Sequence, residues 1–342
     1  MDESQTDSPI EIVRTRSVRT VYIWSYIRNG PRPGPFRTKQ GKGKQWRGND
    51  QPGSTLPRRQ LGRALRDARE GAGFTLEQAA HEMEMGKTSV IRIEKGHNDK
   101  VKQRDVDGFG RLYGLSDRRI DELKALAQQM ATKSWWQADR HLILPRYRTY
   151  IGLESGASQL FSYQPLIVPG LLQVADYARA IEQPQLPSDT PEDLERRVSL
   201  RLRRAAILTR QRNPIPAEFI LHESVLHTVV GSRTVMANEC RHMADISTRD
   251  NIILRILPSS AGFPAAGIPV QPYTILDFPA TGRSFDAEPP VVYCENPIGS
   301  MFFEDAADVR RYRDIHEALQ RATLDEQASR DLLRQVARRY GS

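Results

Sequence analysis

Side chains that can form hydrogen bonds with nucleobases gather in one short segment: Lys87, Thr88, Ser89 and Arg92. Lys and Arg donate to O6 and N7 of guanine in the major groove, and hydroxyl groups can bond with several bases. Other polar residues close by in the sequence could hold phosphate groups. They are Thr75, Lys95, His97, Asn98, Lys100 and Lys102. This combination predicts double-stranded DNA as a partner.

Two short helices joined by a tight turn would have to position these side chains. Apolar residues recur at helical spacing over 76–83, and Val90 and Ile93 continue the pattern after the turn. One face of each helix therefore packs inward, and the polar side chains of the second helix lie on its outer or flanking face. Thr75 and Gln78 have the spacing of a capping box, which predicts where the first helix begins.

Three more apolar stripes predict helices on either side of this pair. One stripe runs over 58–72, a second ends near Tyr113, and a third continues from a cap at Ser116 to about residue 134. Five short helices around one core would make a small all-α domain spanning 58–134.

Residues 58–127 resemble the XRE or lambda-repressor-like helix-turn-helix family, most specifically across the string VIRIEKG at 90–96. The resemblance implies a DNA-binding domain whose recognition helix begins near Lys87. It also implies that Arg69 and Glu94 form a partly buried ion pair, which ties the first helix to the end of the recognition helix. Removing one partner of such a pair strands the other charge.

Three positions depart from the pattern of this family. Glu84 stands where a turn glycine with positive φ is usual, so we expect a strained or rearranged turn. Gly86 stands where Ser or Thr commonly caps the recognition helix, and Leu76 stands where Gln often contacts phosphate. Neither of these two contacts is carried over to this chain.

The length of 342 residues is sufficient for two domains, and a content of 39% hydrophobic and 27% charged residues is that of an ordinary soluble protein. No apolar run approaches the ~20 residues that cross a bilayer, and no apolar signal core occurs near the N-terminus. These features predict a cytoplasmic protein without a membrane partner. The net charge of +8 suits a polyanionic partner.

Residues 1–57 are rich in Arg, Lys, Gly and Pro, which predicts a basic and mostly disordered N-terminal extension. Two interpretations stay open. The extension is a basic arm that adds nonspecific affinity for DNA, or it is an extension without a role.

Beyond residue 134, helical stripes alternate with short β-like runs. We expect an α+β domain over 135–342 with a small antiparallel sheet, which makes the chain a multidomain protein. The predicted strands are 218–222, 252–257, 273–278 and 291–295. The predicted helices are 150–162, 169–182, 192–212, 225–248, 305–322 and 325–340, with Pro169 as a first helical residue.

Three strings in this second part resemble the domain of unknown function that follows an XRE-type helix-turn-helix in many actinobacterial regulators. They are VPGLLQVADYARA at 168–180, ESVLHTVVG at 223–231 and RILPSSAG at 255–262. The resemblance spans roughly 135–340 and implies an architecture rather than a chemistry, because the family domain has no settled activity. It also implies a small partner protein encoded nearby.

We expect no metal, no cofactor and no enzymatic activity. His222 and His227, beside Glu223, superficially resemble a zinc-protease helix, but at about 100° per residue they diverge by roughly 140°. Cys240 and Cys294 are the only cysteines, too few for a zinc site, and we interpret them as buried structural thiols. No nucleophile motif such as G-x-S-x-G frames the Ser, His and Asp residues.

Two other groups are interpreted as structural. The arginines of one predicted helix form a solvated face rather than a second nucleic-acid surface. They are Arg196, Arg197, Arg201, Arg203, Arg204, Arg210 and Arg212. Trp135 and Trp136 form a packed hinge rather than a platform on which bases stack.

The leading hypothesis is a sequence-specific transcription regulator that binds DNA as a homodimer, with a C-terminal domain that receives a protein or small-molecule signal. In this reading Lys87, Thr88, Ser89 and Arg92 read bases. The alternative is a partner-binding adaptor or antitoxin-like module whose helix-turn-helix serves autoregulation. An enzymatic second domain is a third option, and pocket residues would distinguish it.

Overall fold

The computed structural model describes residues 56–342 apart from 99, 132–134, 137–138, 186, 188, 266, 280–287 and 297–298. The predicted extension at 1–57 lies outside the described residues except for its last two, which begin a helix. The domain boundary expected after residue 134 also falls at residues outside this description, so it stays a prediction.

Within the described residues, five helices form the N-terminal region. They are α1 (Leu56–Gly71), α2 (Leu76–Glu82), α3 (Lys87–Glu94), α4 (Gln103–Leu112) and α5 (Asp117–Ala131). Their apolar faces meet in one cluster that includes Leu61, Leu65 and Phe109. At the start of α2 the capping box is complete. The Thr75 hydroxyl accepts from the Gln78 N–H, and the Gln78 side chain accepts from the Thr75 N–H.

Two glycines allow α1 to approach the end of α3 closely. A Cβ on Gly62 would lie 2.5 Å from the backbone oxygen of Ile93, and a Cβ on Gly96 would lie 2.9 Å from that of Arg58. Gly96 also has a φ of +63°, a left-handed conformation that suits glycine after a helix. The placement of α3 against α1 therefore depends on the absence of side chains at these points.

Replacing Gly62 by alanine should destabilise the helix-turn-helix region by ~1–3 kcal/mol, because backbone atoms cannot move aside as the end of a side chain can. The matched control is Gly71→Ala, also in α1, where a Cβ would meet nothing within 4 Å. The control should be neutral or stabilising, since alanine favours helix. Urea unfolding followed by circular dichroism measures both variants. A Gly62→Ala variant as stable as the parent would contradict the close contact.

The described part of the C-terminal region contains a six-stranded mixed sheet, which corrects the expected small antiparallel sheet. The strands are β1 (Gln159–Gln164), β2 (Ala217–His222), β3 (Ile252–Leu257), β4 (Tyr273–Asp277), β5 (Val291–Glu295) and β6 (Ser300–Phe303). Their order is β3-β2-β1-β4-β5-β6. The first three strands are parallel, and β4, β5 and β6 add antiparallel pairs. Parallel neighbours need long crossovers, and the helices between β1 and β3 provide them.

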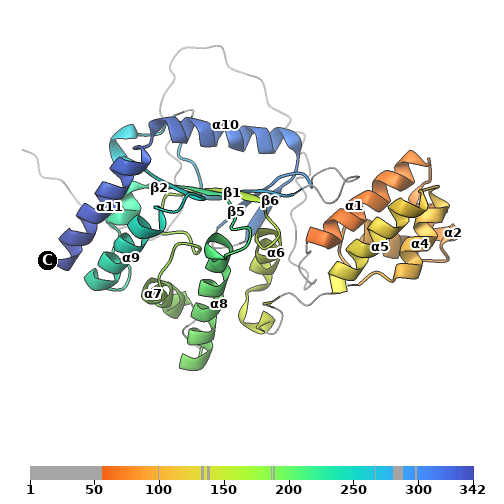
Figure 1. Ribbon diagram of the computed structural model, residues 1–342, viewed down its shortest axis with the longest axis horizontal. Coiled ribbons are helices and arrows are strands. Elements are labelled where there is room, and N and C mark those ends of the chain that lie inside the picture. Colours follow the sequence, from red (N-terminus) through yellow and green to blue (C-terminus); the bar gives the residue numbers. More distant parts are fainter. Residues whose placement is uncertain are drawn as a thin grey trace, which may run out of the picture. The chain divides into compact units, whose positions relative to one another are not determined.

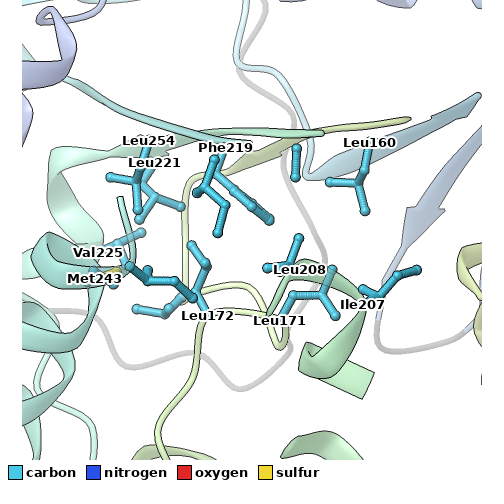
Figure 2. Packing of buried hydrophobic residues seen from close by; sticks show 14 of the residues in the cluster. Leu160, Leu171, Leu172, Ile207, Leu208, Phe219, Leu221, Val225, Met243 and Leu254 are labelled. Carbon is cyan, nitrogen blue, oxygen red and sulfur yellow. The ribbon is translucent and has the colours of Figure 1, made fainter. Parts of the chain in front are cut away.

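Helices cover both faces of this sheet (Figure 1). One face carries α10 (Ala306–Ala322), whose Val309 and Leu319 pack on the strands. The opposite face carries α6 (Pro145–Glu154), α7 (Ala175–Gln185), α8 (Pro191–Thr209), α9 (Arg233–Ile246) and α11 (Glu326–Gly341). Figure 2 shows the main core there, in which Leu172 and Leu208 face strand residues such as Phe219.

One predicted helix is in part a strand. The stripe at 150–162 ends as α6 at Glu154, and residues 159–164 form β1 instead. β1 pairs with both β2 and β4, so it lies inside the sheet. A strand covered on both faces loses the clean alternation that would have distinguished it from a helix. The sequence analysis also missed β6, a short edge strand.

The predicted helix at 169–182 begins later than expected. Pro169 precedes a turn and is not a first helical residue, because α7 starts only at Ala175. Hydrogen bonds hold the preceding segment in its non-helical form: the Tyr177 hydroxyl accepts from the Val168 N–H, and the Gln173 side chain donates to the Val168 carbonyl. The helix predicted at 225–248 likewise begins late, at the start of α9 after its Ser232 cap.

No helix among the described residues combines the length and the apolar character needed to cross a membrane.

Candidate nucleic-acid interface

The recognition helix α3 has one buried face and one exposed face. Val90 and Ile93 point into the helical core. The residues predicted to read bases are all exposed. They are Lys87, Thr88, Ser89 and Arg92. The helix therefore presents cationic and hydroxyl groups to solvent from a backbone that the core holds in place, as the reading of base edges in a major groove requires.

The turn before α3 is strained, as expected from Glu84 standing where the helix-turn-helix family usually has glycine. Glu84 has a φ of +50°, in the left-handed region that few non-glycine residues adopt. Gly86 is the N-cap of α3 and supplies no side-chain cap. The departures at Glu84 and Gly86 are thus both visible in the structure, and the one at Gly86 leaves the first turn of α3 without a side-chain acceptor.

Lys87 is engaged by a carboxylate that sequence analysis did not connect with it. Its ammonium group forms an ion pair with Glu77 of α2, and both side chains are exposed. This hydrogen bond from Lys87 is the main reason that the pKa of Glu77 lies below its ordinary value. Only the packing of α2 against α3 brings the two residues together, so their separation in the sequence gave no indication of the pair.

Arg69 and Glu94 lie in a buried, bidentate contact behind the recognition helix. Arg69 Nε donates to Glu94 Oε1 at 2.6 Å and Arg69 Nη2 donates to Glu94 Oε2 at 3.0 Å. Arg69 Nη1 also donates to the carbonyl of Phe74, before α2. One guanidinium group therefore connects α1, the α1–α2 loop and the end of α3. The hydrogen bond with Glu94 is the largest cause of the raised pKa of Arg69.

The candidate phosphate-binding residues come from two places around α3. Thr75 is exposed at the N-cap of α2, where its hydroxyl oxygen already accepts from Gln78. The others follow α3. Among them Lys95, Lys100 and Lys102 are exposed, whereas His97 and Asn98 are half-buried. The three exposed ammonium groups can neutralise phosphates without prior rearrangement of the core.

DNA affinity should rise as the pH falls below about 6.5, and His97 should cause much of this rise. Burial lowers the pKa of His97 below 6.5 in the free protein, and the charges of Lys95, Arg92 and Arg59 lower the pKa further. A phosphate beside the ring would stabilise the imidazolium, so binding would take up a proton. Fluorescence anisotropy with a DNA duplex between pH 5.5 and 8 measures the effect.

His97→Gln should flatten that pH profile, whereas His141→Gln, an exposed histidine of the C-terminal region, should leave it unchanged. An identical pH profile for the parent and His97→Gln would place His97 away from phosphate.

The other groups singled out in the sequence have local partners. Among the described residues, no group of His, Cys, Asp and Glu could hold a metal ion. Glu223 Oε2 accepts from the Ser259 N–H, and Glu223 Oε1 lies 3.7 Å from His227 Nε2. His222 Nδ1 contacts Ser224 instead. Four arginines of the α8 cluster form ion pairs with carboxylates, which favours a structural role over a nucleic-acid surface. The pairs are Arg196–Asp139, Arg197–Asp189, Arg201–Glu182 and Arg204–Glu154.

The tryptophans and cysteines are also part of the packing. Trp136 is buried, and the guanidinium of Arg203 lies 5.0 Å from the ring centre of Trp135. Cys240 and Cys294 are buried free thiols, and burial raises the pKa of both. None of these four side chains offers a flat, open ring or an accessible thiolate for chemistry.

A five-helix region with an exposed polar recognition helix defines a helix-turn-helix DNA-binding protein. A family model described as a helix-turn-helix domain matches residues 60–123. A second model, described as a domain of unknown function (DUF5753), matches residues 147–335, more than half of the chain. The chain belongs to this DUF5753 family. Neither the curated proteins nor the solved structures gave a match.

Proposed function

We propose that this protein is a sequence-specific transcription regulator of the XRE type. The observation that carries the proposal is the exposed polar face of α3, which presents Lys87, Thr88, Ser89 and Arg92 opposite the buried Val90 and Ile93. The match of residues 60–123 to a helix-turn-helix family supports DNA binding and regulation. Binding to a random pool of duplexes, followed by selection and sequencing, tests whether a preferred site exists.

The proposed regulator acts as a homodimer. One recognition helix contacts only a few base pairs, so useful specificity requires two helices on a pseudo-palindromic site. The half-sites should lie about 10 base pairs apart or a multiple of this distance, one turn of the duplex. Selected duplexes without any repeated half-site would count against the dimer.

Arg92→Ala should weaken binding to the selected site by ~1–3 kcal/mol and relax the preference for one base pair. The reason is that a guanidinium group can bond with both O6 and N7 of one guanine. A matched control is Arg118→Ala, which removes another exposed arginine from the same region, on α5. Electrophoretic mobility shifts with the selected site and a scrambled duplex give both affinities. An equal loss on the two duplexes would make Arg92 a phosphate contact instead.

The proposed role of the C-terminal domain is to receive a protein or small-molecule signal and to alter DNA affinity. We assign it no catalytic step. Among the described residues, His222 Nδ1 lies 2.8 Å from Ser224 Oγ, but the same Nδ1 also accepts from the Ser224 N–H. In hydrolases the serine faces Nε2, while Nδ1–H is oriented by a carboxylate. The arrangement around His222 is therefore suited to holding a loop rather than activating a nucleophile.

A further inference from the structure

A cavity of about 280 Å³ opens at the carboxyl ends of the three parallel strands. Residues that directly follow β1 form one side of it, namely Pro165 and Leu166. His222, the last residue of β2, and Ser224 form another side. The segment after β3 closes it with Phe263 and neighbouring residues. In open sheets that contain parallel strands, ligands bind preferentially beyond the carboxyl ends of those strands.

The wall of this cavity carries no full charge. Its lining contains no Asp, Glu, Lys or Arg, and most of it is apolar, with Leu166, Phe263 and Val270 among the contributors. Leu166 is 65% exposed and Phe263 is 58% exposed, so the rim offers large apolar side chains without a cover from the described residues. A charged ligand would lose hydration here without gaining a countercharge. An uncharged, largely apolar ligand matches the wall.

The imidazole of His222 supplies a directional polar group. Its Nδ1 accepts from the Ser224 N–H at 3.2 Å. Because a backbone N–H can only donate, we assign the lone pair to Nδ1, which places the proton of the neutral ring on Nε2. The Ser224 hydroxyl lies 2.8 Å from the same Nδ1, to which it can donate, and 2.9 Å from the Pro165 carbonyl, so it lies between His222 and the end of β1. Among the described residues no acceptor bonds with Nε2–H, which leaves a donor for a molecule in the cavity.

We propose that this cavity binds a small uncharged organic molecule with an apolar body and one oxygen acceptor, such as a ketone, ester or ether. The body contacts Leu166, Phe263 and Val270, and the oxygen accepts from His222 Nε2–H. The volume of about 280 Å³ is at the lower end of ligand pockets, so the molecule is smaller than most drugs. The role of this ligand as a signal rests on the proposed regulatory function, but its binding does not.

The probe is 6-propionyl-2-(dimethylamino)naphthalene, a neutral fluorophore with a single carbonyl whose emission shifts to the blue in apolar surroundings. We expect saturable binding of one molecule per full-length chain, with blue-shifted emission and without DNA present. His222→Phe keeps an apolar ring but removes the donor. It should weaken binding by about threefold to tenfold, the cost of one hydrogen bond, and shift the emission further to the blue.

Two other variants test whether the probe contacts the apolar lining of the cavity. Val270→Trp fills the half-buried interior and should weaken binding by about tenfold or more. Phe263→Asp changes the exposed rim without touching the core, so it keeps the test valid if the first variant folds poorly. Met301→Trp is the matched control, because Met301 is also a large exposed apolar residue but lies on β6, outside the lining.

Three outcomes overturn the proposal: no saturable binding, binding that Val270→Trp and Phe263→Asp leave unchanged, or equal weakening by Met301→Trp. If the rim instead binds only an apolar side chain of a partner protein, the probe will show no saturable binding, which is the first of these outcomes. The result is also separable from the regulatory function. If the probe binds as expected and the chain never binds DNA, the cavity proposal stands and the regulator fails. If DNA is bound and the probe is not, only the cavity proposal fails.

Discussion

Arg69→Ala should lower the free energy of unfolding of the helix-turn-helix region by ~3–5 kcal/mol, the range for breaking one side of a buried ion pair. The cost arises because Glu94, which is only 6% exposed, would keep its charge but lose both hydrogen bonds with Arg69 and retain only the longer 3.8 Å contact with Arg66 Nε. The Phe74 carbonyl would lose its Arg69 donor as well. Thermal and urea unfolding followed by circular dichroism measure the loss.

Two variants show whether the stranded charge is the cause. Arg69→Met combined with Glu94→Leu removes both charges and should recover much of the stability, because apolar replacements of a buried pair are often neutral. Arg111→Ala, in the same region, removes an exposed arginine that pairs with Asp107 and should change stability by less than ~1 kcal/mol. An Arg69→Ala protein that melts with the parent would refute the structural importance of the pair.

The stability of the C-terminal region should fall by roughly 4 kcal/mol between pH 5 and pH 8 because of Glu239. Glu239 is fully buried in α9, where Oε2 accepts from the Val174 N–H at 2.8 Å and Oε1 has no partner among the described residues. Burial raises its pKa to about 8. The folded carboxyl therefore keeps a proton that the unfolded chain releases above pH 4.5.

The direction of this pH dependence follows from the difference in proton binding between the folded and the unfolded chain. The stabilisation is complete below the unfolded pKa and is lost as the pH rises through the folded value of about 8, at about 1.4 kcal/mol per unit. Glu239→Gln should remove most of this slope, since the amide stays neutral and can still accept from Val174. Glu317→Gln, which removes an exposed carboxylate from α10, is the control. Urea unfolding at several pH values measures both, and a slope shared by parent and Glu239→Gln would contradict the assignment.

Local patterns in the sequence were sufficient for the helical region. The stripe that contains Val90 and Ile93, and the cap at Thr75, each depend on residues within two helical turns. The sheet was predicted less well, because strand pairing depends on residues far apart in the chain. β1 was assigned to a helix since its neighbours β2 and β4, which cover its edges, lie more than fifty residues downstream. The parallel order of β1, β2 and β3 was therefore not accessible from the sequence either.

In the candidate interface, too, features set by local sequence were predictable and features set by distant residues were not. Exposure on α3 followed from helical periodicity, so the outward position of Thr88, Ser89 and Arg92 could be predicted, while their role in reading bases stays a prediction. The partner of Lys87 could not, because it depends on how α2 crosses α3. The cavity beside His222 was also missed, since it exists only where the ends of separate parallel strands meet. Those strands are brought together by the crossover helices, not by any short motif.

On the proposed recognition surface, the Glu77 carboxylate competes with DNA for the ammonium group of Lys87. In the free protein a carboxylate already neutralises the first cation of α3, so Lys87 adds little to long-range attraction toward any stretch of DNA. On the preferred DNA site, the Lys87 ammonium group would leave the Glu77 carboxylate and donate to a base instead. The negative charge of Glu77 would then lie near the DNA phosphates, which repel it. Duplexes that offer no acceptor in that position gain nothing from the exchange. In the proposed function, Glu77 therefore lowers the overall affinity for DNA and increases the discrimination between sequences.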